Sequence, residues 1–349
     1  MDAAHDVLGR RSDAGGRPPL RQIMGHSSIA PDRTRGVTRA PYHGPMKIGL
    51  VLPMSDADGP GAGAWTRLKQ LAQLAEAGGI DSLWLYDHVI FRFPEEDEAG
   101  LHEATTLLAA VAAATERAEL GTIVLCTGFR PPAITAKMAA TIDEIANGRL
   151  ILGLGAGWHE PEYTAFGYPF DHRVGRFEES LEIILPLVRG ERVTFHGRFH
   201  DVEDAVLLPP PPRPGRLPGR MPILIAAKGE RMLRLTAKHA DAWNTAWFGF
   251  PDERSLGRIA DVRAACEAAG RDPATLEITV GLTIDTKTTD PGRPGASGPL
   301  PPDVDTIARA FDAWRDHGVG TVQLDLRPVD EQTIELLLAA RARHLGLPG

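Results

Sequence analysis

The most reactive neighbours in the sequence are Asp87 and His88, which directly follow the apolar run 83–86. A histidine can give or take a proton near neutral pH, and an adjacent carboxylate can stabilise the charge that it acquires. The apolar run is typical of a buried strand, so both residues would stand at a strand end. We expect His88 to be catalytic and Asp87 to support the site, and a purely structural histidine is the alternative interpretation.

A glycine-rich stretch follows another predicted strand and ends in Trp158. Gly155 and Gly157 let the backbone approach a flat or phosphorylated ligand, because no side chain intervenes, and Trp158 adds an aromatic wall. A dinucleotide fingerprint needs a glycine where Trp158 stands, and it would follow the first strand, not the fourth. The stretch therefore favours a ligand site other than a Rossmann NAD site. Glycines chosen only for crowding between strands are the alternative.

A third segment, 226–230, passes from a predicted strand directly into a predicted helix. The first N–H groups of a helix have no partner within the helix, and together with the helix dipole they attract anions. We expect a phosphate or similar anion here, with Lys228 adding a charge unless it is merely a solvated lysine. The residues of this predicted anion site are Ala227, Lys228, Gly229 and Glu230.

Other kinds of chemistry have little support. His196 and His200 are four residues apart, but Gly197 and the β-branched and aromatic flanks predict a hairpin, where this spacing has no metal geometry. We expect no metal site. The sequence contains no Gly-x-Ser-x-Gly, Walker or His-Glu-x-x-His motif, so it gives no support to a serine hydrolase, a P-loop protein or a zincin.

The elements that must position these residues alternate between strand and helix. Predicted strands are 47–52, 83–86, 120–125, 149–154, 223–226, 241–245, 276–284 and 320–326. Predicted helices are 64–77, 103–117, 133–146, 175–188, 230–239, 254–269, 303–317 and 330–344. This pattern predicts an α/β fold, a (β/α)8 TIM barrel with insertions after strands 4 and 7, at 193–208 and 285–302. Functional residues should then follow strand ends, and these include Cys126, Thr127 and Gly128.

Composition and charge set further limits. The 349 residues are 43% hydrophobic and 24% charged, which suits one large globular domain. We expect residues 1–45 to be a disordered N-terminal tail and 46–349 to be the barrel domain. A net charge of -8 argues against nucleic acid as a partner. Two distant cysteines and the lack of a membrane-length apolar run predict a cytoplasmic protein without a membrane span.

Together these residues resemble the luciferase-like oxidoreductase family, which uses reduced FMN or the deazaflavin coenzyme F420 on a (β/α)8 barrel. The resemblance covers about residues 46–345. Its stretches are 77–88, 132–143, 148–158, 195–199, 222–235 and 240–244, in this order.

The resemblance implies positions for the cofactor. Its ring would lie near His88, Cys126–Gly128 and Gly157, and its phosphate near Lys228–Glu230. A non-proline cis peptide would join Cys126 to Thr127, and His88 would act as acid or base. In sugar-phosphate dehydrogenases of the family a glutamate stands where this chain has Trp158, so the resemblance argues against that substrate class.

The resulting functional prediction is an oxidoreductase that acts on a small organic substrate with a reduced flavin or deazaflavin as cosubstrate. Hydride transfer with F420 is the favoured reaction. A monooxygenase that uses reduced FMN and O2, similar to alkanesulfonate monooxygenases, is one alternative, and a non-catalytic flavin-binding protein is another. A flavin or F420 reductase as electron source and a homodimer are implied by the same resemblance.

Overall fold

The computed structural model describes residues 46–55, 61, 63–94, 97–210, 221–288 and 298–347. All of them belong to one compact unit of the chain. The predicted tail, 1–45, lies outside the described residues, as does half of the predicted insertion 285–302.

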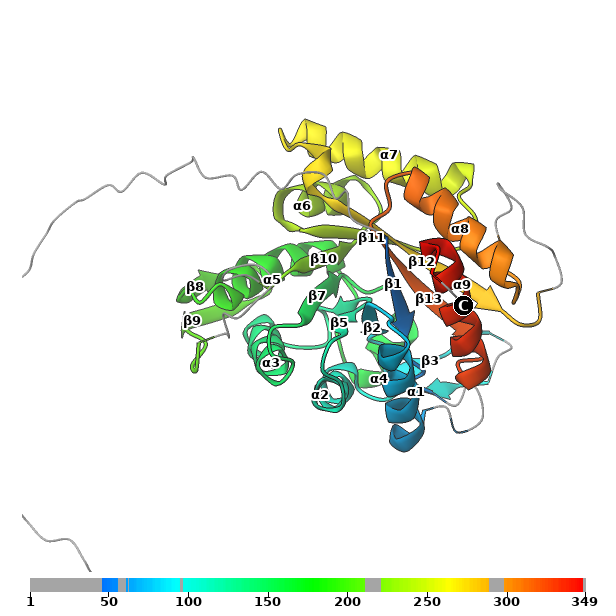
Figure 1. The fold of residues 1–349 in the computed structure, drawn as a ribbon. Coiled ribbons are helices and arrows are strands. Elements are labelled where there is room, and N and C mark those ends of the chain that lie inside the picture. The colour runs from blue at the N-terminus through cyan, green and yellow to red at the C-terminus, as the bar shows by residue number, and fades with distance from the viewer. Residues whose placement is uncertain are drawn as a thin grey trace, which may run out of the picture. The chain divides into compact units, whose positions relative to one another are not determined.

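Eight parallel strands close into a barrel that is surrounded by helices (Figure 1). The third strand is formed by two consecutive pieces, β5 and β6, and the pairing of β10 with β7 closes the ring. The predicted (β/α)8 barrel is therefore confirmed. Its strands are β1 (Lys47–Val51), β2 (Ser82–Leu85), β5 (Glu119–Thr122), β6 (Leu125–Cys126), β7 (Leu150–Gly155), β10 (Ile223–Ala226), β11 (Ala242–Phe248), β12 (Glu277–Asp285) and β13 (Thr321–Arg327).

The helices that cover the barrel differ in how they begin. Asp252, Asp303 and Asp330 precede α7, α8 and α9, and each carboxylate accepts hydrogen bonds from free N–H groups of the first turn. The first turns of α5 and α6 receive no such side-chain bond. The helices are α1 (Trp65–Ala77), α2 (Ala104–Ala114), α3 (Pro132–Ile145), α4 (Glu160–Phe166), α5 (Arg173–Val188), α6 (Glu230–His239), α7 (Glu253–Ala268), α8 (Val304–Asp316) and α9 (Glu331–Leu345).

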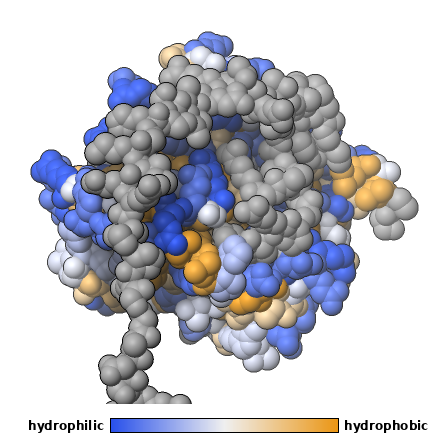
Figure 2. Space-filling view, turned by 90° about the vertical axis from the view of Figure 1, so that its left-hand side faces the viewer, coloured by the Kyte–Doolittle hydropathy of each residue, from blue (hydrophilic) through white to orange (hydrophobic). Residues whose placement is uncertain are grey.

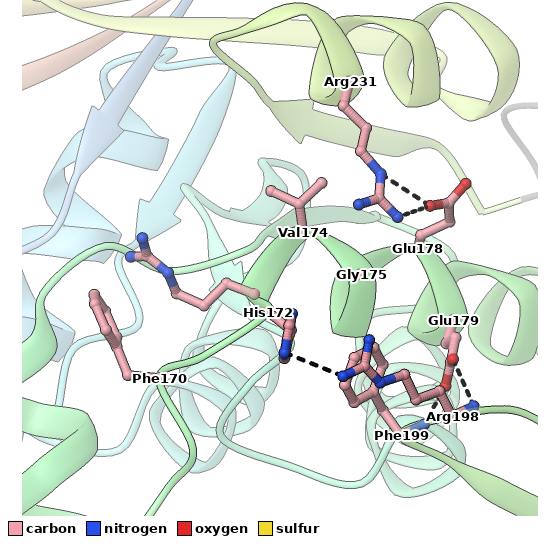
Figure 3. Close-up of a pocket in the computed structure, with 10 residues that line it drawn as sticks. Phe170, His172, Val174, Gly175, Glu178, Glu179, Arg198, Phe199 and Arg231 are labelled. Atoms are coloured by element: carbon pink, nitrogen blue, oxygen red, sulfur yellow. Dashed lines mark hydrogen bonds and ion pairs between the residues drawn. The ribbon is translucent and has the colours of Figure 1, made fainter.

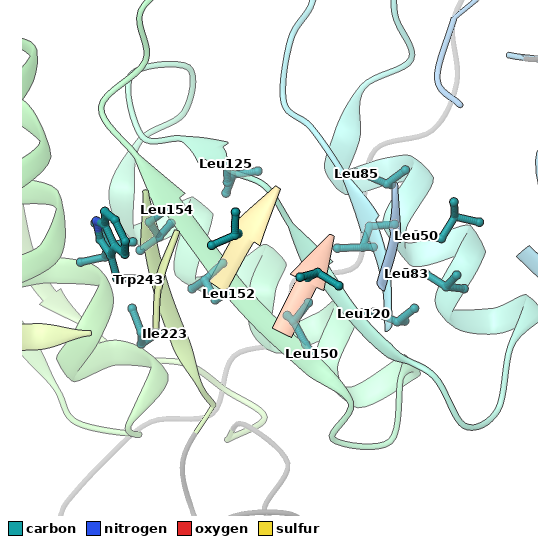
Figure 4. Close-up of a cluster of buried hydrophobic side chains, with 14 of the residues drawn as sticks. Leu50, Leu83, Leu85, Leu120, Leu125, Leu150, Leu152, Leu154, Ile223 and Trp243 are labelled. Carbon is teal, nitrogen blue, oxygen red and sulfur yellow. The ribbon is translucent and has the colours of Figure 1, made fainter. Parts of the chain in front are cut away.

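The barrel core is built from the apolar side chains of its strands. Leucines such as Leu50, Leu83 and Leu154 are almost completely buried, as expected for parallel strands that are covered on both faces (Figure 4). Trp84 fills part of the interior, and Gly49 and Gly121 leave room for its ring.

Some elements were not predicted from the sequence. The helix α4 and the hairpin β3 (Ile90–Phe91) and β4 (Ala99–Gly100) are too short to show a clear apolar period. The hairpin predicted around His196 and His200, in contrast, is present as the antiparallel pair β8 (Val193–His196) and β9 (Asp201–Ala205).

Apolar residues are distributed as follows in the described helices and on one face of the molecule. None of the helices in the described part of the chain combines the length and apolar character that a membrane span requires. On the coloured part of the face in Figure 2, hydrophobic residues form small separate groups among hydrophilic ones. The homodimer remains a prediction.

Candidate active site

A cavity of about 410 Å³ opens at the carboxyl ends of the barrel strands. This volume lies within the range of about 300–1,000 Å³ that is usual for small-molecule sites. Four separate strand ends that the sequence singled out meet there. The predicted residues that line the cavity are Asp87, His88, Cys126, Gly155, Gly157, Trp158, Ala227 and Lys228.

The remaining predicted residues stand just outside the cavity wall. Thr127 is buried, and its N–H donates to the Gly155 carbonyl at 3.0 Å. Gly128 packs against the Tyr163 ring. Gly229 begins α6, and the exposed Glu230 side chain pairs with Arg234 at 2.7 Å on its own helix. Thr127, Gly128 and Gly229 thus lie within two residues of ones that line the cavity, whereas the Glu230 side chain is engaged on the surface of α6.

His88 is held by a buried carboxylate that the sequence did not indicate. Its Nδ1 lies 2.9 Å from Oε1 of Glu162, and Oε2 of Glu162 accepts from the Val89 N–H at 3.1 Å. The Glu162 side chain is only 1% exposed. Because an ionised carboxylate can only accept hydrogen bonds, Nδ1 of His88 must be the protonated nitrogen. In the neutral ring, Nε2 is then free to accept a proton.

Aromatic rings surround this histidine. The ring centroid of Phe91 lies 4.4 Å from that of His88, and Trp158 meets His88 edge-on at 5.5 Å. Phe93 stacks on Trp158 at 6.3 Å. Trp158 therefore forms an aromatic wall beside His88, as the sequence suggested. The His88 side chain beside it is 15% exposed.

Asp87 does not support His88 in the way that its position in the sequence suggested. Its carboxylate accepts two hydrogen bonds from Arg130, at 2.7 and 2.9 Å, and one from the Cys126 N–H at 2.8 Å. Burial disfavours the charge of Arg130, but the bonds to Asp87 and to Glu103 outweigh it and raise the guanidinium pKa. Successive residues leave a strand in opposite directions, so Asp87 ties β2 to β6 while His88 faces Glu162.

The third strand is interrupted at the cavity, but not where the family resemblance implied. The non-proline cis peptide joins Ile123 to Val124, and Cys126–Thr127 is not cis. Cys126 is paired with Gly155 in the sheet, so the backbone there keeps its register. The interruption falls between β5 and β6, and Ile123 and Val124 both line the cavity. A second non-proline cis peptide, Ala246–Trp247, also borders it.

Cys126 contributes a protonated thiol to the cavity wall. Its sulfur lies 2.9 Å from the hydroxyl of Tyr163, which also donates to the Ala156 carbonyl at 3.0 Å. Burial raises the pKa of the Cys126 thiol to about 12. Gly157 has a positive φ of 74°, and a Cβ there would collide with Tyr163 and Cys126. The close contact explains why this position holds glycine.

The opposite end of the cavity is positively charged. Loss of solvation lowers the pKa of Lys228, and the nearby charges of Arg258 and Arg254 lower it further. Arg173 also lines the cavity, and its Nη1 donates to the Gly157 carbonyl at 3.2 Å. None of these four cations forms an ion pair with another residue in the part of the chain that the structure describes. An anion would be stabilised at this end.

Several residues of the site escaped sequence reasoning. Glu162 and Tyr163 lie on the short helix α4, and Arg130 lies in the loop before α3. The carboxylates in the stretch after Trp158 were the only local signal for Glu162. Within the described ranges, no group of three or more His, Cys, Asp or Glu side chains is placed to hold a metal ion.

Known proteins resemble the chain in sequence and in fold. Residues 46–290 match the family model described as luciferase-like monooxygenase. The chain is 34% identical over 249 residues to a phthiodiolone/phenolphthiodiolone dimycocerosates ketoreductase of Mycobacterium sp. (strain JLS), with 66% of this chain and 63% of the relative covered. It is 32% identical over 247 residues to an F420-dependent glucose-6-phosphate dehydrogenase of Kineococcus radiotolerans, with 69% of each covered.

Among solved structures, an F420-dependent secondary alcohol dehydrogenase in complex with an F420-acetone adduct has the same fold. The TM-score is 0.68 at 19% identity, and the match covers 84% of this chain and 98% of that one. Distant homologues of the chain use F420 or FMN. The family match spans most of the barrel, including every strand end that lines the cavity. The chain thus belongs to the luciferase-like monooxygenase family, a family of flavin- and F420-dependent oxidoreductases.

Proposed function

We propose that this protein is an F420-dependent oxidoreductase that transfers a hydride between F420 and a small organic substrate. The observation that carries the proposal is His88, whose Nδ1 is held by the buried Glu162 while Nε2 remains available for a proton. Hydride transfer to or from an oxygen-bearing carbon needs one positioned proton donor or acceptor, and His88 meets that need. The ketoreductase and dehydrogenase relatives support this reaction class.

The cavity suits a flat ring that carries an anionic chain. Ile123, Val124, Ala227 and Met232 give it an apolar wall, and Lys228 stands at one end beside the first turn of α6. A deazaflavin or flavin has this distribution of polarity, with a fused ring at one end and a phosphate at the other. Lys228 and the free N–H groups of α6 would hold the phosphate. When bound, F420 supplies or accepts the hydride.

The chain's own residues would then control the proton and the water. Nε2 of His88 would take the proton of a substrate hydroxyl, or return it to a carbonyl oxygen in the reverse direction. Glu162 would stabilise the imidazolium that forms, because its carboxylate is already hydrogen-bonded to Nδ1. Trp158 and Phe93 would cover the histidine against solvent.

The test is a titration of the purified full-length protein with F420 and with FMN, each oxidised and reduced, followed by fluorescence and calorimetry. Preferential binding of F420 supports the proposal. Preference for reduced FMN together with O2 consumption would favour a monooxygenase, the activity after which the family model is named. Binding of neither compound would refute both functions.

Replacement of His88 distinguishes an enzyme from a non-catalytic flavin-binding protein. The His88→Ala variant should bind F420 as the wild type does but lose turnover by about 100-fold or more. The matched control is His196→Ala, which removes an exposed histidine on β8 that does not line the cavity. Unchanged turnover in the His88 variant would remove this residue from the mechanism, and a lack of turnover in the wild type would favour a non-catalytic flavin-binding protein.

A further inference from the structure

A short segment beside the active-site histidine is bound to a second histidine, which the reaction described above does not use. The segment 90–93 begins with β3 and carries Phe91 and Phe93. The N–H of Arg92 donates to Nε2 of His159 at 3.1 Å. His159 directly precedes α4 and is only 4% exposed. A buried hydrogen bond therefore ties this segment to the start of α4.

The two phenylalanine rings of the segment 90–93 pack against His88 and its aromatic neighbours. The ring centroid of Phe91 lies 4.4 Å from that of His88 and 5.6 Å from that of Phe93. Phe93 in turn stacks on Trp158 at 6.3 Å. The ring of His159 lies 4.9 Å from Phe93 and 5.1 Å from Trp158. His159 therefore contacts the same aromatic rings whose backbone it binds.

The hairpin that contains this segment is short. β3 and β4 pair through two residues of each strand. The ion pair between Arg92 and Glu98, at 2.7 Å, is exposed and lies within the hairpin segment itself, so it adds little to the attachment to the barrel. Just before the segment, the Val89 N–H donates to Glu162 at 3.1 Å. Beyond that point, the bond from Arg92 to His159 holds the backbone against α4.

The direction of this hydrogen bond fixes the protonation of His159. A backbone N–H can only donate, so Nε2 of His159 is unprotonated and the neutral ring carries its proton on Nδ1. Protonation of Nε2 would place two donors opposite each other and break the bond to Arg92. Burial lowers the pKa of His159, the charge of Glu162 opposes this effect, and a charge on His88 adds to it. The ring is therefore neutral near pH 7 and becomes charged only in more acidic solution.

An exposed histidine of the same chain shows why the burial of His159 matters. Nε2 of His172 also accepts a hydrogen bond, from Arg198 at 3.2 Å, at a cavity of about 520 Å³ beside the N-terminal part of α5 (Figure 3). The His172 side chain is 50% exposed, so water can replace it as the partner of Arg198. At the buried His159, loss of the acceptor leaves the Arg92 N–H unsatisfied unless the segment moves into water.

We infer that His159 is a positioning residue that closes the active site. While its Nε2 is unprotonated, it binds the Arg92 N–H and keeps the two phenylalanine rings over His88. Protonation of Nε2 releases the segment 90–93 and opens the site. The inference goes beyond the proposed function, because it requires neither a particular cofactor nor a particular substrate.

Hydrogen exchange of the Arg92 amide in the unliganded full-length protein tests the bond directly. In the wild type, the protection factor of this amide, corrected for the intrinsic pH dependence of exchange, should fall by about tenfold or more between neutral pH and the pH at which His159 is protonated. His159→Leu should show the low protection at every pH. His159→Gln should keep the protection at every pH, because its side-chain oxygen can accept the same bond and does not titrate.

Chemical modification of His88 measures access to the site. Diethyl pyrocarbonate acylates an unprotonated imidazole nitrogen, and peptide mass spectrometry gives the rate at His88 near neutral pH. In His159→Leu this rate should rise by up to the factor lost in the protection of Arg92, because the same local opening exposes both groups. His159→Gln should keep the wild-type rate. The matched control is His196→Leu, which removes an exposed histidine on β8 and should change neither measurement.

The pH profiles separate His159 from the other titrating groups around it. A wild-type protection of Arg92 that does not fall in acid would overturn the inference. An equal fall in His159→Gln would also overturn it, because the titration would then belong to Glu162 or His88. Low protection in His159→Leu without faster modification of His88 would show that the bond does not close the site.

Two further points keep the test decisive. If His159→Leu fails to fold, the pH profiles of the wild type and of His159→Gln decide the question by themselves. Because no cofactor is present, refutation of the role of His159 would leave the proposed function intact, and failure of the protein to bind F420 would leave the role of His159 intact.

Discussion

Replacement of Glu162 by glutamine tests how the site controls its proton. In the wild type, the two carboxylate oxygens accept from His88 Nδ1 at 2.9 Å and from the Val89 N–H at 3.1 Å. A glutamine of the same shape has one oxygen and one NH2 group, so it cannot accept both bonds. The Val89 N–H is fixed by the backbone and can only donate. The amide oxygen should therefore turn to Val89, and the NH2 group should face His88.

This arrangement reverses the preferred tautomer of the histidine. A protonated Nδ1 opposite an NH2 group would leave a donor unsatisfied in a buried place, at a cost of about 1–3 kcal/mol. Taking 2 kcal/mol as the middle of this range, the tautomer with a free Nε2 becomes about 30-fold rarer. The kcat of substrate oxidation, for which Nε2 must accept a proton, should fall by about the same factor. The Kd for F420 should change by less than about twofold, because both Glu162 oxygens bond to the chain itself.

Two measurements check this reasoning. Nitrogen-15 NMR of histidine-labelled protein reports which ring nitrogen carries the proton, with His88→Ala to assign the signal. Steady-state kinetics give kcat separately from cofactor affinity. The matched control is Glu160→Gln, which makes the same change at an exposed position of α4. A Glu162→Gln variant that keeps the proton on Nδ1, or keeps full turnover with the reversed tautomer, would refute the proposed role.

Three further predictions concern the buried charges and thiols. Arg130→Met should lower the free energy of unfolding by about 3 kcal/mol, because it leaves the buried Asp87 carboxylate without a cationic partner. The double variant Arg130→Met/Asp87→Asn should recover part of this free energy, and chemical denaturation measures both. Cys126 should resist alkylation by iodoacetamide at pH 8, because a pKa of about 12 leaves only about one in ten thousand of its thiol groups ionised. Peptide mass spectrometry should show rapid labelling of Cys126 only after the protein is unfolded. Burial opposes the charge of Glu103, but hydrogen bonds from Thr106, Thr105 and Arg130 outweigh it and lower the pKa of its carboxyl group from 4.5 to about 2. The stability that this carboxylate contributes is therefore complete above pH 4.5 and is lost as the pH falls toward 2. Glu103→Gln should accordingly flatten the stability profile between these pH values.

The barrel could be predicted from the sequence because its signals are local. Apolar periods and stop signals mark each strand and helix independently of the rest of the chain. The helix predicted at 230–239 coincides with α6, and the helix predicted at 133–146 lies within one residue of α3. Eight such units in succession favour one closed topology. The strand ends then bring His88, Gly157 and Lys228 to one cavity, although these residues are far apart in the sequence.

The hydrogen bonds and ion pairs within the site join residues that are far apart in the sequence, so no local sequence pattern predicts them. Glu162 is separated from His88 by 74 residues, and Arg130 is separated from Asp87 by 43. Adjacency in sequence suggested Asp87 as the partner of His88, but a strand end turns neighbouring side chains to different sides. The cis peptide that the resemblance implied at Cys126–Thr127 lies at Ile123–Val124 instead, and apolar residues run through 123–125 without a change of pattern that would mark the interruption of the strand.

The positions of Trp158 and Glu162 bear on the kind of substrate. The family resemblance places a glutamate of sugar-phosphate dehydrogenases at position 158, where this chain presents an exposed indole ring to the cavity. The chain has a carboxylate four residues later, on α4, but both of its oxygens are engaged by His88 and Val89. Glu162 therefore influences the proton held by His88, and each of its oxygens already has one partner within the chain. In this site the carboxylate of Glu162 is hydrogen-bonded to His88, and the surface offered to the substrate is aromatic. Such a site should favour substrates that are less polar than sugars.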